Sequence, residues 1–139
     1  MGRSRGGLTT KLHLAASDEE TTLAVVLTPG QQHDSTVVDD VLAAVPASCP
    51  VEAAVMDKAY DSDDIRTGLH EQKIQAVIPS KTNRVKPIPH DQKLYRGRNC
   101  VERLIGKLKQ FRAVATRYDK LASTFLSMVH LVAAFVMAR

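Results

Sequence analysis

The chain has 139 residues, of which 44% are hydrophobic and 4% aromatic. This length favours one domain, and the apolar content is sufficient for a core, so wholesale disorder is excluded. The two cysteines, Cys49 and Cys100, have neither the spacing of a zinc site nor the number that a disulfide framework needs, and no secretory signal is recognisable. We therefore expect a cytoplasmic protein with reduced thiols.

The net charge of +4 conceals a strong asymmetry along the chain. Residues 1–80 carry 6 basic and 12 acidic side chains, whereas residues 81–120 carry 12 basic and 3 acidic ones. Such a concentration of Lys and Arg suits a polyanion, because cations that neutralise phosphates release condensed counterions. Charge alone leaves two interpretations open, a nucleic-acid partner or a solvated basic face without a partner.

The first elements predicted along the chain form a β-hairpin. After a loop at residues 2–7, apolar and polar side chains alternate from Leu8 to Leu14, which indicates a strand with one buried face. The apolar run within residues 21–27 indicates a second strand that is covered on both faces. The polar residues between the two strands favour a short connection.

A helix and a third strand are expected next. Apolar residues at helical spacing predict a helix over residues 35–45, which Asp34 or Ser35 caps and a proline ends. The short apolar run at residues 53–56 predicts a strand that ends on Asp57.

A second alternation of helix and strand follows. Ser62 is expected to cap a helix, with Asp61 and two further aspartates placing negative charge near the positive end of the helix dipole. Residues 74–78 predict a fourth strand. Residues 80–93 are polar and basic and contain two prolines, so we predict a loop long enough to be functional or mobile.

Two helices are predicted for the C-terminal part. Apolar residues recur at three- and four-residue steps from Val101 to Phe111, and the other faces of this helix are charged. Residues 121–138 are apolar nearly all round, but His130 and several hydroxyl residues interrupt them. We therefore expect a helix that is buried or contacts another subunit rather than a membrane anchor. The order of elements predicts an α/β fold, with helices packed on a mixed sheet.

Two groups of residues are candidates for a catalytic or ligand-binding site. Asp57 lies directly after a buried strand, at a sheet rim that ligands can reach, although an aspartate there also suits a simple turn. Tyr95, Arg98, Glu102 and Lys109 follow at spacings of three, four and seven residues, which places them on one side of a helix, beside its apolar stripe. An Arg98–Glu102 surface ion pair is the simpler explanation, but it does not account for all four positions.

These residues resemble the DDE transposases of bacterial insertion sequences, in the group with a Tyr-x2-Arg-x3-Glu-x6-Lys signature. The similar stretches span nearly the whole chain and are residues 2–13 (GRSRGGLTTKLH), 29–35 (PGQQHDS), 56–62 (MDKAYDS), 95–109 (YRGRNCVERLIGKLK) and 117–121 (RYDKL). The resemblance implies a ribonuclease H-like mixed sheet with flanking helices. It also implies that three carboxylates hold two Mg²⁺ ions, with Mn²⁺ as a possible substitute.

By the same resemblance, Asp57 corresponds to the second catalytic aspartate and Glu102 to the catalytic glutamate, and both are expected to bind the metal. Arg98 and Lys109 would hold the scissile phosphate or orient Glu102, and Tyr95 would either donate to a phosphate or pack at the helix entry. The first catalytic aspartate has no counterpart. We therefore expect residues 1–139 to be the C-terminal part of a catalytic domain that lacks its N-terminal strand and is nearly inactive alone.

The remaining cations are expected to contact the DNA backbone without reading bases. They are Lys81, Arg84, Lys86, Arg96, Arg103 and Lys107. The partners implied are double-stranded DNA at transposon ends, a second copy of the chain or an upstream transposase half, and no membrane, which suits a nucleoid-associated protein. The function implied is transposition by metal-dependent cleavage and strand transfer. Three alternatives remain: a non-catalytic fragment that binds DNA or dimerises, another ribonuclease H-like nuclease, and a remnant that cannot fold because loss of the first strand exposes a sheet edge.

Overall fold

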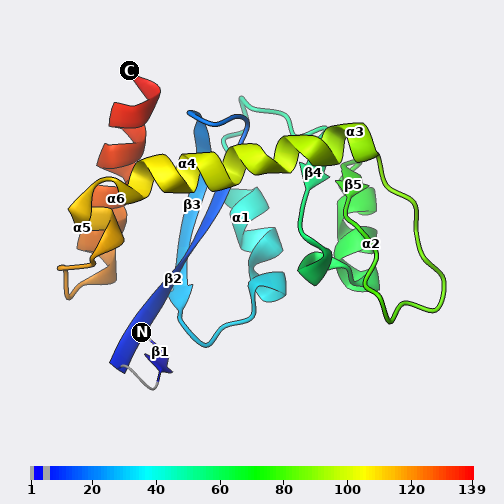
Figure 1. The fold of residues 1–139 in the computed structure, drawn as a ribbon, viewed down its shortest axis with the longest axis horizontal. Coiled ribbons are helices and arrows are strands. Elements are labelled where there is room, and N and C mark those ends of the chain that lie inside the picture. Colours follow the sequence, from blue (N-terminus) through cyan, green and yellow to red (C-terminus); the bar gives the residue numbers. More distant parts are fainter. Residues whose placement is uncertain (1, 5–6) are drawn as a thin grey trace. The chain divides into compact units, whose positions relative to one another are not determined.

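The computed structural model describes residues 2–4 and 7–139, with side chains from Thr9 onward (Figure 1). These residues form two compact units. The described residues of Met1–Pro46 together with Cys100–Arg139 form the first, and Ala47–Asn99 form the second. Of the residues described, those in strands belong to one three-stranded antiparallel sheet and one two-stranded parallel sheet. The fold is therefore mixed α/β, as predicted, whereas the ribonuclease H-like arrangement of a single mixed sheet stays a prediction.

The sheet of the first unit contains the predicted hairpin. Strand β2 (Gly7–Ala16) pairs antiparallel with β3 (Thr22–Pro29), with Leu12 opposite Leu27 and Leu14 opposite Val25. The connection is a tight turn, in which the Asp18 carboxylate accepts hydrogen bonds from the backbone N–H groups of Glu20 (2.8 Å) and Thr21 (2.7 Å). These hydrogen bonds to the aspartate satisfy backbone N–H groups at the turn, where the backbone hydrogen bonds between the two strands end.

Strand β1 (Gly2–Ser4) was not predicted. It pairs antiparallel with the start of β2, in the segment that we expected to be a loop because of its glycines. Backbone pairing with an existing strand needs no apolar side chains, so hydrophobic periodicity gave no signal for it. Residues 5 and 6 of that predicted loop lie outside the described residues.

Helices of the first unit cover both faces of the hairpin. Helix α1 (Val38–Ala44), preceded by the 3-10 turn η1 (Asp34–Val37), contacts β2 and β3, and helix α6 (Ala122–Met137) also contacts β3. The predicted caps are wrong, because the N-cap residue of η1 is His33 and its side chain makes no capping bond. Asp34 instead accepts a hydrogen bond from Lys11 (3.0 Å).

The hydrophobic core of the first unit lies on the face of the hairpin that contains Leu12, Leu14, Val25 and Leu27. Helix α4 (Asn99–Lys109), the short α5 (Arg112–Ala115) and α6 supply its other members. They include Leu104, Leu108, Val114, Phe125, Val129, Val132, Ala133 and Val136. The three- and four-residue spacing in α4 therefore buries one stripe, as its sequence predicted.

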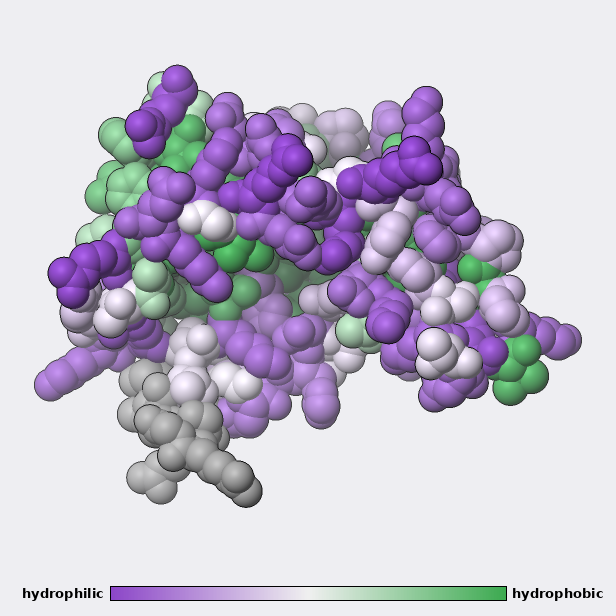
Figure 2. All heavy atoms as spheres, in the orientation of Figure 1, coloured by the Kyte–Doolittle hydropathy of each residue, from purple (hydrophilic) through white to green (hydrophobic). Residues whose placement is uncertain are grey.

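Helix α6 is buried on one side only. Leu131 is 65% exposed and Phe135 52%, and Figure 2 shows hydrophobic surface over this helix. Contact with another subunit thus stays a prediction for the exposed side. No helix in the described part of the chain is long and apolar enough to cross a membrane.

Arg117 fixes the turn before α6 and accounts for part of the RYDKL stretch. Its guanidinium donates to the Thr10 hydroxyl, to the Asp119 carbonyl (2.9 Å) and to the Lys120 carbonyl (3.2 Å), and it lies 5.2 Å from the centroid of the Phe125 ring. A planar guanidinium can make these donor contacts together, which a lysine cannot. This part of the family resemblance therefore has a structural role.

The second unit is built on two short parallel strands. Strand β4 (Ala53–Val55) pairs with β5 (Gln75–Val77), and helix α2 (Asp63–Glu71) connects them. The predicted cap is confirmed, since the Ser62 hydroxyl accepts a hydrogen bond from the Ile65 N–H at 3.2 Å. After β5, the basic loop ends at Asp91, two residues earlier than the predicted 80–93, because Asp91 caps helix α3 (Gln92–Tyr95) by accepting from the N–H groups of Lys93 and Leu94. The 3-10 turn η3 (Arg96–Arg98) follows.

Candidate functional site

Asp57 lies at the carboxyl ends of the two parallel strands of the second unit. Pairing ends just before it, where the Met56 N–H donates to the Val77 carbonyl at 3.1 Å. Asp57 then begins the 3-10 turn η2 (Lys58–Tyr60), and its carboxylate accepts a bond from the Ala59 N–H (3.2 Å). The side chain is still 47% exposed. The turn interpretation of Asp57 is therefore confirmed, and the turn leaves the carboxylate accessible at the strand ends, where ligands of α/β proteins bind.

Two further signature residues lie beside Asp57. A guanidinium nitrogen of Arg98 is 3.8 Å from Asp57 Oδ2, and Arg98 Cζ lies 5.8 Å from the centroid of the Tyr95 ring. Tyr95 in turn makes an edge contact with His90, with ring centroids 5.2 Å apart. The structure thus brings Tyr95, Arg98 and Asp57 together within the second unit. The contacts of the Tyr95 ring favour its packing role.

Glu102 and Lys109 belong to the first unit and lie on α4. Both side chains are exposed, whereas Leu104 and Leu108 of the same helix are fully buried. Seven residues are two helical turns, so Glu102 and Lys109 share one side of α4, away from its buried stripe. The 3-10 turn η3 separates them from Tyr95, and the uniform α-helical spacing assumed for the four residues is therefore interrupted.

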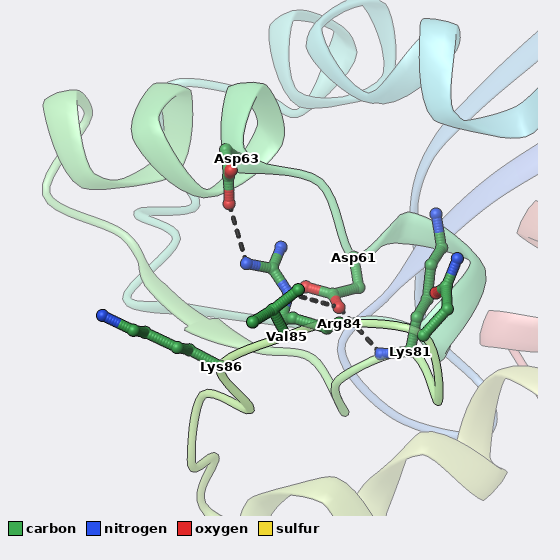
Figure 3. Close-up of a pocket in the computed structure, with 7 residues that line it drawn as sticks. Asp61, Asp63, Lys81, Arg84, Val85 and Lys86 are labelled. Carbon is green, nitrogen blue, oxygen red and sulfur yellow. Dashed lines mark hydrogen bonds and ion pairs between the residues drawn. The ribbon is translucent and has the colours of Figure 1, made fainter.

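Asp61 is a buried carboxylate that sequence analysis treated only as helix-dipole charge. It is 4% exposed. One oxygen accepts from Arg66 Nε (2.8 Å), and the other accepts from the Lys81 backbone N–H (2.8 Å) and from Arg84 Nε (2.9 Å), as Figure 3 shows for the last two. Burial raises the pKa of Asp61, but the hydrogen bonds from Arg84, Lys81 and Arg66 outweigh burial and hold that pKa well below its ordinary value.

No local signal in the sequence distinguishes Asp61 from its neighbours. Asp63 and Asp64 stand next to it in the same polar stretch, and both are exposed. The partners Lys81 and Arg84 are 20 and 23 residues away. Only tertiary contacts separate the buried aspartate from the two exposed ones.

The basic residues expected to bind DNA fall into two groups. Arg84 donates to Asp61 and also to Asp63 (2.9 Å), Arg103 donates to Glu19 (2.9 Å), and Lys107 to Glu20 (2.9 Å). These three cations already have carboxylate partners. The side chains of Lys81, Lys86 and Arg96 are exposed.

Metal ligation can be tested against the donor set. Within residues 2–4 and 7–139, no group of three or more His, Cys, Asp or Glu side chains is placed to hold a metal ion. Asp57 has the hard oxygen donors that Mg²⁺ prefers, and it is exposed. It therefore fits as one ligand, but the described residues do not supply a complete three-carboxylate site.

Ligands of α/β proteins bind at the carboxyl ends of parallel strands, where Asp57 lies, and exposed lysines such as those of the basic loop are the electrostatic signature of nucleic-acid binding. The chain belongs to the family described as the transposase DDE domain, whose model matches residues 2–137. It is 30% identical over 133 residues to a putative transposase for insertion sequence element IS6501 of Brucella ovis, an alignment that covers 95% of this chain and 100% of that relative. No solved structure matches the chain.

Proposed function

We propose that this transposase-family chain acts on DNA at the ends of an insertion sequence, with Asp57 and Glu102 as metal ligands and Arg98 and Lys109 as phosphate contacts. The observation that carries the proposal is Asp57, which is exposed at the strand ends and only 3.8 Å from Arg98. A carboxylate beside a guanidinium offers a place for a cation and a phosphate side by side. Membership of the transposase family supports the DNA substrate.

Each of these side chains has a task that its chemistry suits. When divalent ions are bound, they supply activation of the attacking hydroxyl and stabilisation of the departing oxygen in phosphodiester cleavage. Asp57 and Glu102 would each offer carboxylate oxygens as metal ligands, and Arg98 would orient both Asp57 and a phosphate oxygen through its planar fork. Lys109 would contribute a point charge. Tyr95 would support Arg98 through the contact of its ring with the guanidinium.

Two carboxylates are fewer than the three that the family resemblance implies, so we propose weak metal affinity and low cleavage activity for the chain alone. A stable DNA complex that forms without cleavage is the second candidate function. The exposed Lys81, Lys86 and Arg96 favour it, because phosphate contacts need no metal. A second copy of the chain is the partner that we propose for the complete reaction.

The test measures Mn²⁺ binding by electron paramagnetic resonance and nicking of duplex DNA in Mg²⁺ or Mn²⁺. We expect Asp57→Asn and Glu102→Gln each to abolish specific Mn²⁺ binding. Asp64→Asn removes the same charge as Asp57→Asn from an exposed position on α2 and should leave binding unchanged. We expect nicking by the wild-type chain to be slow at best.

Two outcomes would count against these proposals. Mn²⁺ binding or nicking that is unaffected by Asp57→Asn would show that Asp57 is not at the reacting centre. Rapid nicking that depends on Asp57 would support the site but contradict the proposed low activity.

A further inference from the structure

We propose that Asp61 is a positioning residue that holds the basic loop, residues 80–91, in the conformation that presents Lys81 and Lys86 to the DNA backbone. The proposal rests on the DNA-binding function proposed above. All the residues that carry it belong to the second unit, and Figure 3 shows the central ones.

The first observation is how Asp61 contacts the loop. One carboxylate oxygen accepts hydrogen bonds both from the backbone of Lys81 and from the side chain of Arg84. The other oxygen accepts from Arg66, whose guanidinium also donates to the carbonyl of Ile78 at 2.9 Å, at the end of the strand that precedes the loop. A single buried carboxylate therefore connects helix α2, the end of β5 and the start of the loop.

The second observation is that few other contacts hold the loop. It contains no helix or strand before Gln92. The Ser80 hydroxyl accepts from the Ile88 N–H (2.7 Å) and donates to the Ile88 carbonyl (3.1 Å), which draws the two ends of this stretch together. Val85, between them, is 94% exposed. Asp61, the additional Arg84–Asp63 contact and Ser80 are thus the side-chain contacts that give this stretch one shape.

The third observation concerns which cations remain available. Arg84 pairs directly with Asp61 and Asp63, each at 2.9 Å, beside an open pocket of about 530 Å³ that all three residues line, and its side chain is only 18% exposed. Lys81 and Lys86, which also line this pocket, have exposed side chains, and Lys86 points away from Asp61 in Figure 3. We therefore infer that Arg84 acts in shaping the loop, while the two lysines contact phosphates.

Holding the loop in advance affects DNA affinity for a definite reason. A segment that is ordered only on binding loses conformational entropy at that moment, and the loss weakens the complex. Because Asp61 orders the loop before DNA binds, this entropy is not lost on binding. The spacing of Lys81 and Lys86 is fixed in the same way. A purely structural role for Asp61 would change the stability of the unit without changing how strongly each lysine contributes to DNA binding.

The experiment uses the full chain and a random-sequence DNA duplex, with binding measured by fluorescence anisotropy over a range of salt concentrations. In the wild-type chain, Lys81→Gln and Lys86→Gln should each reduce the slope of log affinity against log salt by about 0.9. In the Asp61→Asn background, each lysine substitution should have much less effect. This coupling is the readout that a merely structural role would not give.

A second readout needs no DNA. Limited trypsin digestion should cleave Asp61→Asn after Lys81 and Arg84 at least several-fold faster than the wild type. The matched control is Asp64→Asn, which removes the same charge from an exposed position on α2 and should be digested at the wild-type rate. Arg84→Lys keeps the charge but loses the planar contact with two aspartates, so it should also digest faster. If Asp61→Asn does not unfold cooperatively, the digestion of Arg84→Lys tests the proposal in its place.

The outcomes separate this inference from the proposed function. If the wild-type chain does not bind DNA, the proposed function fails, and the role of Asp61 in DNA binding fails with it. If the wild type binds DNA but the lysine effects are additive with Asp61→Asn and the trypsin pattern is unchanged, only the inference about Asp61 is overturned.

Discussion

Among the described residues, two buried titratable side chains illustrate how surroundings determine ionisation. Asp61 is charged because three donors surround it, whereas His13 has a single side-chain hydrogen bond, with Thr28 at 2.7 Å. Burial lowers the pKa of His13, with Asp34 raising it and Lys11 lowering it to a smaller extent. The neutral imidazole is therefore the form that fits the hairpin.

We predict that acidification destabilises the first unit through His13. An unfolded histidine titrates near pH 6.5, and its folded pKa is lower, so the unfolded state binds more protons in between. The stability that the neutral ring contributes is fully present above about pH 6.5 and is lost as the pH falls below that value. Thermal unfolding at several pH values between 7.5 and 5 should show this loss in the wild type.

Two variants test the assignment to His13. His13→Gln should show a weaker dependence on pH in this range, because it removes the group that takes up the proton. His130→Gln, at an exposed position on α6, should behave as the wild type does. An equal pH dependence in all three proteins would contradict the prediction.

At the scale of elements, helices α4 and α6 provide the core of the first unit through one buried stripe each. Leu104 and Leu108 of α4 are fully buried, and Val129 of α6 is also fully buried. Leu131 of α6 is 65% exposed, although Val129 and Val132, which are equally apolar, are buried. The contribution of an apolar residue to stability therefore depends on which side of the helix it occupies.

Truncating one leucine on each helix should separate these contributions. We expect Leu104→Ala to reduce the free energy of unfolding by about 2–5 kcal/mol, because it removes buried methyl groups and leaves a cavity. Leu131→Ala should change it by less than about 0.5 kcal/mol. Urea unfolding measured by circular dichroism gives both values. A large loss for Leu131→Ala would instead indicate that the exposed side of α6 is covered in solution by another copy of the chain.

The helix ends show where local sequence rules were sufficient to predict a cap and where they were not. Ser62 caps α2 as predicted, since its hydroxyl reaches the N–H three residues later. Asp34 has the same capping chemistry, but it pairs with Lys11 on the neighbouring strand instead. A side chain that could cap a helix can instead pair with a residue that the fold brings near it. The sequence does not reveal which residue that is.

At the scale of the whole molecule, part of the basic charge is already neutralised. Arg103 and Lys107 of α4 donate to Glu19 and Glu20 of the hairpin turn, more than eighty residues away in sequence. DNA phosphates would therefore compete with carboxylates for these two cations. The +9 balance of residues 81–120, from 12 basic and 3 acidic side chains, overstates the charge available to a polyanion.

We predict that removing these carboxylates strengthens DNA binding. Glu19→Gln and Glu20→Gln should each raise the affinity for a DNA duplex about two- to fivefold at low salt, because Arg103 and Lys107 are released. The gain should shrink as salt rises. Glu52→Gln makes the same change in net charge at an exposed position of the second unit, and it is the control in the same anisotropy assay. A gain of equal size for Glu52→Gln would mean that only net charge matters.

Local patterns in the sequence were sufficient to predict most secondary-structure elements and the family. Alternating and helical spacing predicted the hairpin, α2, α4 and α6, because these patterns reflect which side of an element is buried. Motif spacing likewise identified Asp57, Arg98 and Tyr95, which the structure brings together. Tertiary structure alone decided that β1 pairs with β2, that Asp61 is buried beneath the basic loop, and that Arg84, Arg103 and Lys107 face carboxylates. The ion pairs and the burial of Asp61 depend on contacts between residues far apart in the chain, which no local pattern encodes. The β1 pairing is local, but it uses backbone hydrogen bonds, which the pattern of side chains does not reveal.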